Sequence, residues 1–278
     1  MARLSPQQFG ILITLVSAVM WSTAGLFVRM ADIDIWSLVG WRSVFTGLTL
    51  GAWIALRPRG AMTFGLPGVV STLISTVAAI AYIVALSWTS VANVMTVYAA
   101  LPFSAGLIAW LWFRERVTAR FILAGLVALA GVLVMTGAAM APRDIAGIAV
   151  AVLMTVLFSA QLVIARRYPR LDSARMIALA AVLCVLIALP WMESPTPRAL
   201  LACALYGSIS TGLGYILVLI GGRLIGAGEA AFLSLIDVVL GPIWVWIFFA
   251  EAISPATMIG GGAVLAAVVW YLAPLLQR

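Results

Sequence analysis

Residues 9–29 read FGILITLVSAVMWSTAGLFVR, and this stretch contains no charged side chain before Arg29. An apolar helix of about 20 residues, rising 1.5 Å per residue, crosses the roughly 30 Å hydrocarbon core of a bilayer. Lipid offers no partner to an unpaired backbone amide, so only helices and closed barrels span it. Barrel strands are about 10 residues long and alternate in polarity, and this stretch does neither. It therefore predicts a transmembrane helix.

The same pattern continues along the whole chain. Apolar stretches alternate with short polar breaks that carry Pro, Gly or charge, such as Arg57-Pro58-Arg59-Gly60. Trp and Tyr gather near the ends of the stretches, as is typical of interfacial aromatic residues. The predicted spans are 9–29, 36–56, 66–87, 92–113, 119–138, 146–165, 174–190, 198–220, 228–249 and 255–275. The sequence thus predicts an all-α integral membrane protein with ten transmembrane helices.

The composition agrees with this class and excludes others. Hydrophobic residues make up 65% of the 278 residues and charged residues 9%, whereas a soluble protein carries about 25% charged residues. The formal net charge of +7 comes from scattered arginines, and they form no patch that would indicate nucleic acid. The chain has no His, which excludes a His relay or a His-ligated metal. No cofactor, metal or disulfide is predicted.

Arginines are distributed unevenly between alternate loops. If the N-terminus is inside, twelve arginines fall in inner segments, and three, Arg29, Arg143 and Arg198, fall in outer ones. The positive-inside rule therefore predicts that both termini are cytoplasmic. We interpret the first apolar stretch as a retained span, because it is longer than a signal-peptide core and lacks a cleavage motif. The loops are short and predict no attached ATPase.

The two halves of the chain share residues at a nearly constant spacing. Trp21 in the first half corresponds to Phe158 in the second, and Trp112 corresponds in the same way to Phe248. We interpret this spacing as an internal repeat of five helices. Because five is odd, the second repeat would be inverted, as in transporters whose halves rock around a midplane site. The predicted repeats are residues 1–138 and 139–278.

The ends of both halves resemble a known family. The first half contains Asn93, Leu101-Pro102-Phe103 and Trp110-Leu111-Trp112-Phe113-Arg114-Glu115-Arg116-Val117-Thr118, and the second ends with Phe249-Ala250-Glu251-Ala252-Ile253-Ser254. These segments resemble the EamA-type halves of the drug/metabolite transporter superfamily, and the resemblance covers essentially the whole chain. The family's Gly-Glu-Arg pattern is only partly kept, since Arg114 replaces the Gly and the second copy has Ala250 and Ala252.

Within this superfamily the chain is similar to the bacterial YddG-like amino acid exporters. The resemblance implies ten helices, with a central cavity lined by helices 1–4 and 6–9 and with helices 5 and 10 set aside. It also implies export of small organic metabolites, including aromatic amino acids, across the bacterial inner membrane. The expected partners are then an amino acid-like small molecule and the lipid bilayer.

Charged side chains inside the predicted spans are the sharpest candidates, because an ionised group in a bilayer is costly unless it is paired or hydrated. Asp237 lies about 13 Å along its span and Arg42 about 9 Å along its own. They could bind a charged or zwitterionic solute, with Asp237 also carrying a proton, or they could form a structural ion pair. Glu229 could have a proton or gating role, or could simply stabilise the dipole of the ninth helix.

Polar and aromatic residues at mid-depth are a second set of candidates. Such groups often only join helices, at about 0.6 kcal/mol each. Together they would instead line a cavity suited to an apolar or aromatic solute with a polar head. The predicted substrate-binding residues are Trp21, Ser22, Arg42, Tyr82, Asn93, Tyr98, Gln161, Tyr215, Ser234 and Asp237.

Helix-breaking residues suggest where the predicted helices move. Pro102 and Pro242 would each remove one intrahelical hydrogen bond and loosen a gate helix. Gly207, Gly212 and Gly214 would permit bending of the eighth span.

These patterns predict a secondary transporter that exports small organic metabolites by alternating access. The alternatives are export of other metabolites or of drug-like cations, and a solute channel. A channel would need a continuous polar or carbonyl filter, which the sequence does not show. An enzyme would need a nucleophile–base set or a metal cluster, and the acids are too few, so no catalytic residue is predicted. The sequence predicts no oligomeric state.

Overall fold

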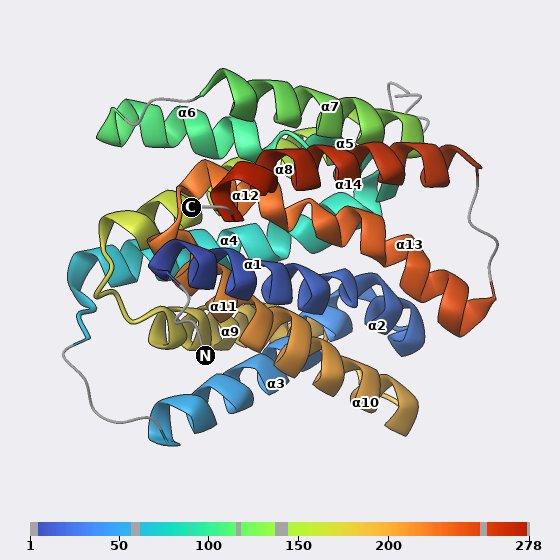
Figure 1. The fold of residues 1–278 in the computed structure, drawn as a ribbon. Coiled ribbons are helices and arrows are strands. Elements are labelled where there is room, and N and C mark those ends of the chain that lie inside the picture. Colours follow the sequence, from blue (N-terminus) through green and yellow to red (C-terminus); the bar gives the residue numbers. More distant parts are fainter. Residues whose placement is uncertain are drawn as a thin grey trace.

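The computed structural model describes residues 5–56, 62–89, 91–114, 118–136, 144–250 and 255–276. Within these ranges the chain is helical, apart from turns and one isolated bridge between Thr63 and Leu171. The helices lie side by side in one bundle (Figure 1). The start of α1 (Pro6–Ser22) and the end of α14 (Pro255–Leu276) lie at the same end of this bundle (Figure 1).

The helices follow the predicted spans closely. In the first half, α1 is followed by α2 (Ala24–Ala31), α3 (Ile35–Leu56), α4 (Gly65–Trp88), α5 (Val91–Tyr98), α6 (Leu101–Phe113) and α7 (Ala119–Thr136). The second half contains α8 (Ile145–Arg167), α9 (Ser173–Ala188), a 3-10 turn (Leu189–Trp191), α10 (Pro197–Leu205), a π-helix (Tyr206–Gly214), α11 (Tyr215–Leu224), α12 (Ala227–Ser234), α13 (Ile236–Phe249) and α14.

Within the described ranges, eight helical stretches are long and apolar enough to cross a membrane, and this confirms the predicted class of all-helical membrane protein. A further apolar helix, Ala119–Met135, is shorter. α3 is not among the eight although it has 22 residues, and it carries Arg42 together with buried Ser and Thr side chains. The number of ten spans therefore stays a prediction.

Three of the predicted spans are interrupted. The first breaks at Thr23, the fourth at Ala100 and the ninth at Leu235. The helices that follow the last two breaks both end on a residue in the left-handed conformation, Arg114 with φ 58° and Ala250 with φ 54°. These two caps occupy corresponding positions of the sequence repeat, so the same local backbone recurs in both halves.

Helix packing also recurs between the halves. α7 packs along α14, α3 along α9, and α6 of the fourth predicted span against α12 of the ninth. α4 packs along α8, and α11 packs along α1. Numbered as predicted spans, these pairs are 5 with 10, 2 with 7, 4 with 9, 3 with 6, and 8 with 1. Each span has its counterpart five places along the chain. Exchanging the counterparts leaves the first three pairs unchanged and converts the pair 3 and 6 into the pair 8 and 1.

The glycine-containing part of the eighth predicted span forms the π-helix Tyr206–Gly214. The expected bend is therefore a widened helical segment. Hydroxyl groups of two neighbouring helices bond to its carbonyl groups: Ser17 Oγ donates to Gly214 O at 2.6 Å, and Thr46 Oγ1 donates to Gly207 O at 2.9 Å. Segments of π-helix are frequent at functional sites, and this one borders the pocket described below.

Some residues used in the sequence argument lie outside the described ranges. They include the motif residues 115–117 and 251–254. Six of the arginines behind the predicted orientation also lie outside these ranges: Arg3, Arg57, Arg59, Arg116, Arg143 and Arg278.

Candidate functional site

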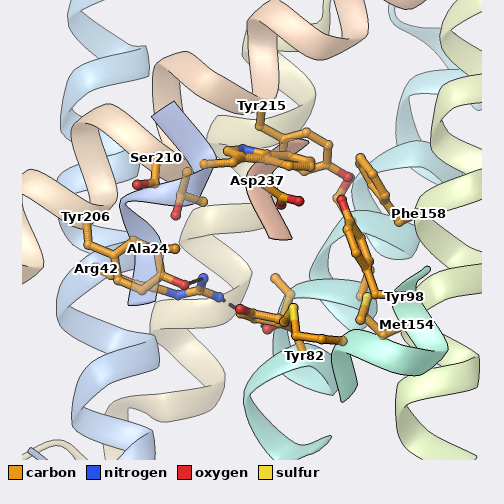
Figure 2. Close-up of a pocket in the computed structure, with 16 residues that line it drawn as sticks. Ala24, Arg42, Tyr82, Tyr98, Met154, Phe158, Tyr206, Ser210, Tyr215 and Asp237 are labelled. Atoms are coloured by element: carbon orange, nitrogen blue, oxygen red, sulfur yellow. Dashed lines mark hydrogen bonds between the residues drawn. The ribbon is translucent and has the colours of Figure 1, made fainter. Parts of the chain in front are cut away.

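A pocket lies between the two halves of the chain, with about 760 Å³ of empty space including its open mouth. Its walls come from α1, α2, α3, α4, α5, α8, the π-helix, α11 and α13 (Figure 2). Among the described residues, α7 and α14 contribute nothing to the lining, as the family resemblance implied. α9 also contributes nothing, and the resemblance did not imply that.

Three aromatic rings form one wall of the pocket. The ring centroids of Trp21 and Phe158 lie 4.9 Å apart, and those of Trp21 and Tyr215 lie 5.7 Å apart. Phe158 and Tyr215 complete the set at 5.6 Å. The rings are tilted against one another, an arrangement that the charge distribution of aromatic rings favours. We call Trp21, Phe158 and Tyr215 the aromatic wall.

Arg42 lies at a different part of the lining, beside Tyr206 (Figure 2). Its side chain is buried, with 4% of the residue exposed. Its NH1 group donates to Tyr206 Oη at 3.3 Å, and its NH2 group donates to Ala79 O at 3.2 Å. The guanidinium also lies over the Tyr206 ring, 5.3 Å from its centroid. In the described part of the chain no carboxylate pairs with Arg42, so the ion pair with Asp237 considered above does not form.

Asp237 lines the same pocket from the first turn of α13, two residues after the break at Leu235. The residue is partly exposed, but its Oδ1 atom is buried and has no hydrogen-bond partner. The Arg42 Nε atom and the Tyr98 hydroxyl group are also buried without a partner. Buried polar atoms are almost always partnered by protein or water. Arg42 and Asp237 therefore contribute opposite charges to the lining of one cavity without an ion pair between them.

A set of hydrogen bonds lies behind part of this lining. Gln161 Nε2 donates to Ser71 O and, at 2.8 Å, to Ser75 Oγ. The Ser75 and Tyr215 hydroxyl groups lie 3.4 Å apart. Ser75 and Tyr215 line the pocket, whereas Gln161 does not. Gln161 is therefore a linker between α8 and α4 and not part of the lining.

Six of the ten predicted binding residues line the pocket: Trp21, Arg42, Tyr82, Tyr98, Tyr215 and Asp237.

Besides Gln161, three further predicted binding residues are outside the lining and bond to neighbouring residues of the fold instead. Ser22 Oγ accepts a hydrogen bond from Trp244 Nε1 at 2.7 Å, which joins α1 to α13. Asn93 Nδ2 donates to Thr89 Oγ1 at 2.8 Å. Ser234 Oγ donates at 2.8 Å to the carbonyl four residues earlier in its own helix. These three residues therefore fit the alternative stated above, in which a polar group only forms a structural hydrogen bond.

Glu229 also lies away from the pocket. Its Oε2 atom accepts from the Gly226 backbone N–H at 3.1 Å, at the start of α12. Its Oε1 atom accepts from Tyr271 Oη at 2.9 Å. This position matches the alternative in which an acid stabilises the first turn of a helix.

The two prolines differ in position. Pro102 lies in the first turn of α6, directly after the break at Ala100. The N–H that proline lacks has no intrahelical partner there, so the expectation that Pro102 removes a helical bond is wrong. Pro242 lies inside α13, where proline does remove such a bond.

Sequence reasoning missed several lining residues. Tyr206, Ser210 and Thr211 belong to the π-helix, and Met95 and Met154 belong to ordinary helices. Phe158 was the exception that could have been found, because it is the repeat counterpart of Trp21. The other five carry no sequence signal, since apolar and hydroxyl residues occur on every face of these helices.

Comparison with known proteins agrees with this architecture. A family model described as the EamA-like transporter family matches the chain twice, over residues 8–137 and 145–273. A solved structure described only as "Crystal structure of protein" has a TM-score of 0.85 and 22% sequence identity. The match covers 96% of this chain and 98% of that chain, and at this identity it shows the fold alone. No curated protein matches.

Proposed function

The chain belongs to the EamA-like transporter family, and from this premise we propose that it exports amino acids, including aromatic ones, by alternating access. The family transports small metabolites across membranes. The observation that carries the finer proposal is the pocket between the halves. It combines an aromatic wall with the charged residues Arg42 and Asp237, which are not paired with each other. An amino acid with an apolar side chain has groups complementary to these: an apolar part, a carboxylate and an ammonium group.

The proposed architecture is ten spans in two inverted five-helix repeats, residues 1–138 and 139–278, with both termini in the cytoplasm. The two family matches support the division into halves. The exchange of helix contacts between the halves supports a twofold relation between them. The start of α1 and the end of α14 lie at one end of the bundle (Figure 1), as an even number of crossings requires.

The proposed mechanism closes the pocket alternately at the two ends of the bundle. Hydrogen bonds at the ends of α8 and α11 are suited to the closed cytoplasmic side. Arg166 NH1 donates to Ile225 O at 2.6 Å. Arg223 donates to Pro169 O at 2.9 Å and to Leu171 O at 2.6 Å. Opening this side would separate these partners, while the opposite side closes over the substrate.

Export of an organic cation is a second candidate. An aromatic wall beside a carboxylate is a typical site for such a cation, and Trp21 and Asp237 both line the pocket. Arg42 in the same lining opposes a solute that carries only positive charge.

Reconstitution into liposomes tests the proposed function. Proteoliposomes loaded with unlabelled L-phenylalanine should accumulate radiolabelled L-phenylalanine by exchange, and protein-free liposomes should not. Trp53, an exposed residue on α3, offers a control, because Trp53→Ala should exchange as the wild type does. The proposal of amino acid export is overturned if no proteinogenic amino acid exchanges while the protein remains folded and monodisperse.

A further inference from the structure

We infer that the pocket holds a zwitterion in one orientation, with its carboxylate at Arg42 and its ammonium group at Asp237. This inference rests on the proposed function and assigns a role to each charged residue of the site. The aromatic wall then contacts the apolar side chain of the solute. Neither charged group is paired with the other across the pocket (Figure 2).

Arg42 has the properties of a carboxylate-binding group. Its two observed hydrogen-bond acceptors, Tyr206 Oη and Ala79 O, are neutral, so the positive charge is held in place without being compensated. A guanidinium has five N–H donors, and the Nε–H of Arg42 has no partner. The planar fork of a guanidinium matches a carboxylate geometrically.

Asp237 and Tyr98 have the properties of an ammonium-binding pair. Asp237 Oδ1 and the Tyr98 hydroxyl oxygen both lack a partner. Both residues line the pocket, and Tyr98 is only 7% exposed. An ammonium group has three N–H donors and no acceptor, which suits two oxygen atoms that would otherwise be buried without hydrogen bonds.

The fold itself does not explain these two charges. α9, which packs along α3 as its counterpart in the repeat, carries no charged residue beyond Arg175 in its first turn. α5 and α6, the counterparts of α12 and α13, carry no charged residue at all. In each case the corresponding helix of the other half folds and packs without a charge like that of Arg42 or Asp237. A function in the pocket accounts for charges that are costly within a membrane.

The charge arrangement predicts a selectivity. A zwitterion compensates both residues, whereas an amine leaves Arg42 unpaired and a carboxylic acid leaves Asp237 unpaired. A site that loses one expected polar partner rejects the truncated ligand strongly, because its own buried group stays unpaired. L-phenylalanine should therefore bind at least about tenfold more tightly than phenethylamine or 3-phenylpropionate, which lack one charged group each.

The test measures binding of these three compounds to the full-length detergent-solubilised protein by ligand-induced thermal stabilisation. Arg42→Gln should lose the preference for L-phenylalanine over phenethylamine and keep the preference over 3-phenylpropionate. Asp237→Asn should do the reverse. Trp53→Ala is the control, since Trp53 lies on the same helix as Arg42 but is exposed and outside the pocket lining, and it should keep the wild-type order.

Several outcomes overturn the assignment. Equal binding of phenethylamine and L-phenylalanine to the wild type does so, and so does an equal loss of all three ligands in both charge variants. Arg42 also links α3 to α4, so Arg42→Gln could fail to fold, and Asp237→Asn alone then decides. If Asp237→Asn still prefers L-phenylalanine over 3-phenylpropionate as strongly as the wild type does, the assigned orientation is rejected. Exchange of L-phenylalanine in liposomes without these selectivity changes rejects only the orientation. Absence of both exchange and binding rejects the proposed function as well.

Discussion

Trp21 and Phe158, from opposite halves of the chain, face each other in the pocket with ring centroids 4.9 Å apart. They occupy corresponding positions in the two halves. If the halves are related by the proposed twofold axis, two corresponding residues can touch each other only close to that axis. The pocket would then lie where the movement that we propose for alternating access changes its shape most directly.

The aromatic wall should determine affinity for the apolar part of the solute. Trp21→Ala and Phe158→Ala remove large contact surfaces, and each should raise the half-saturating concentration of L-phenylalanine about fivefold or more, since an aromatic contact contributes about 1 kcal/mol beyond area burial. Radiolabelled exchange at several substrate concentrations measures this. Trp53→Ala, which changes an exposed ring outside the pocket, should leave the value unchanged, and an equal effect of all three would indicate a general loss of fold.

The crossing of α7 and α14 should not tolerate a side chain at Gly260. A Cβ atom added at Gly260 would lie 2.2 Å from Gly131 O, whereas one added at Gly262 would meet no atom within 4 Å. Gly260→Ala should therefore destabilise the protein by about 1–3 kcal/mol, and Gly262→Ala should be neutral or slightly stabilising. Thermal unfolding in one detergent compares the two. Equal melting temperatures would contradict the close packing of these helices.

Much of the fold could be predicted from hydropathy, because burial in lipid requires long apolar stretches and the helix boundaries follow them. The breaks at Thr23, Ala100 and Leu235 could not. They lie inside uniformly apolar sequence, where hydropathy does not record the path of the backbone. The nine-residue π-helix could not be predicted for the same reason. Its glycines indicated a bend but did not indicate that the bend would be a π-helix.

The candidate site was predictable where a side chain is costly in a membrane. Arg42 and Asp237 were predicted because a charged side chain inside an apolar span is energetically costly, and both line the pocket. Asn93 and Ser234 do not line the pocket, because a small polar group is satisfied by a nearby residue as easily as in a cavity: Asn93 bonds to Thr89 at the end of α4, and Ser234 bonds within its own helix. Tyr206 was missed, since its place in the site depends on its contact with Arg42, which the sequence alone does not show.

Asp34 should make stability depend on acid pH. Burial acts to raise the pKa of this carboxyl, but the hydrogen bonds from Ser37 and Trp36 outweigh it, and the pKa lies below its ordinary value of 3.8. Asp34 Oδ1 accepts from the Trp36 and Ser37 backbone N–H groups at 2.9 Å and 3.0 Å, which caps α3. Because the pKa is lowered in the folded state, this stabilisation is present above the ordinary pKa and lost as the pH falls through the folded-state value.

Asp34→Ala should therefore lower the stability at neutral pH by up to about 1 kcal/mol, given that the group is exposed to solvent. The difference from the wild type should shrink as the pH falls below the ordinary pKa of 3.8, because the carboxyl then becomes protonated in the folded state as well. Asp34→Asn is the control, because an asparagine caps a helix nearly as well without titrating. Thermal unfolding at a series of pH values measures these differences, and a difference that is constant with pH would contradict the proposed role of the carboxylate.

Gln161 should influence which side of the protein is open. Its bonds to Ser71 and Ser75 hold α8 against α4 behind the pocket, and Gln161 itself does not line the pocket. Gln161→Leu removes these bonds at a cost of about 1 kcal/mol to the observed conformation. A two-state equilibrium would then shift about fivefold toward the opposite conformation, since about 1.4 kcal/mol corresponds to a factor of ten.

Cysteine labelling measures that shift. The native Cys184 and Cys203 are 2% and 0% exposed, so an Ala24→Cys variant would place one reactive thiol in the pocket lining. In the proposed orientation, a membrane-impermeant maleimide added outside should modify this thiol more slowly when Gln161→Leu is also present. Thr155→Val, on the same helix, removes a hydroxyl that donates to the helix's own backbone and should leave the rate unchanged. An unchanged rate in Gln161→Leu would mean that these bonds are kept in both conformations, so that the moving boundary lies elsewhere than between α8 and α4.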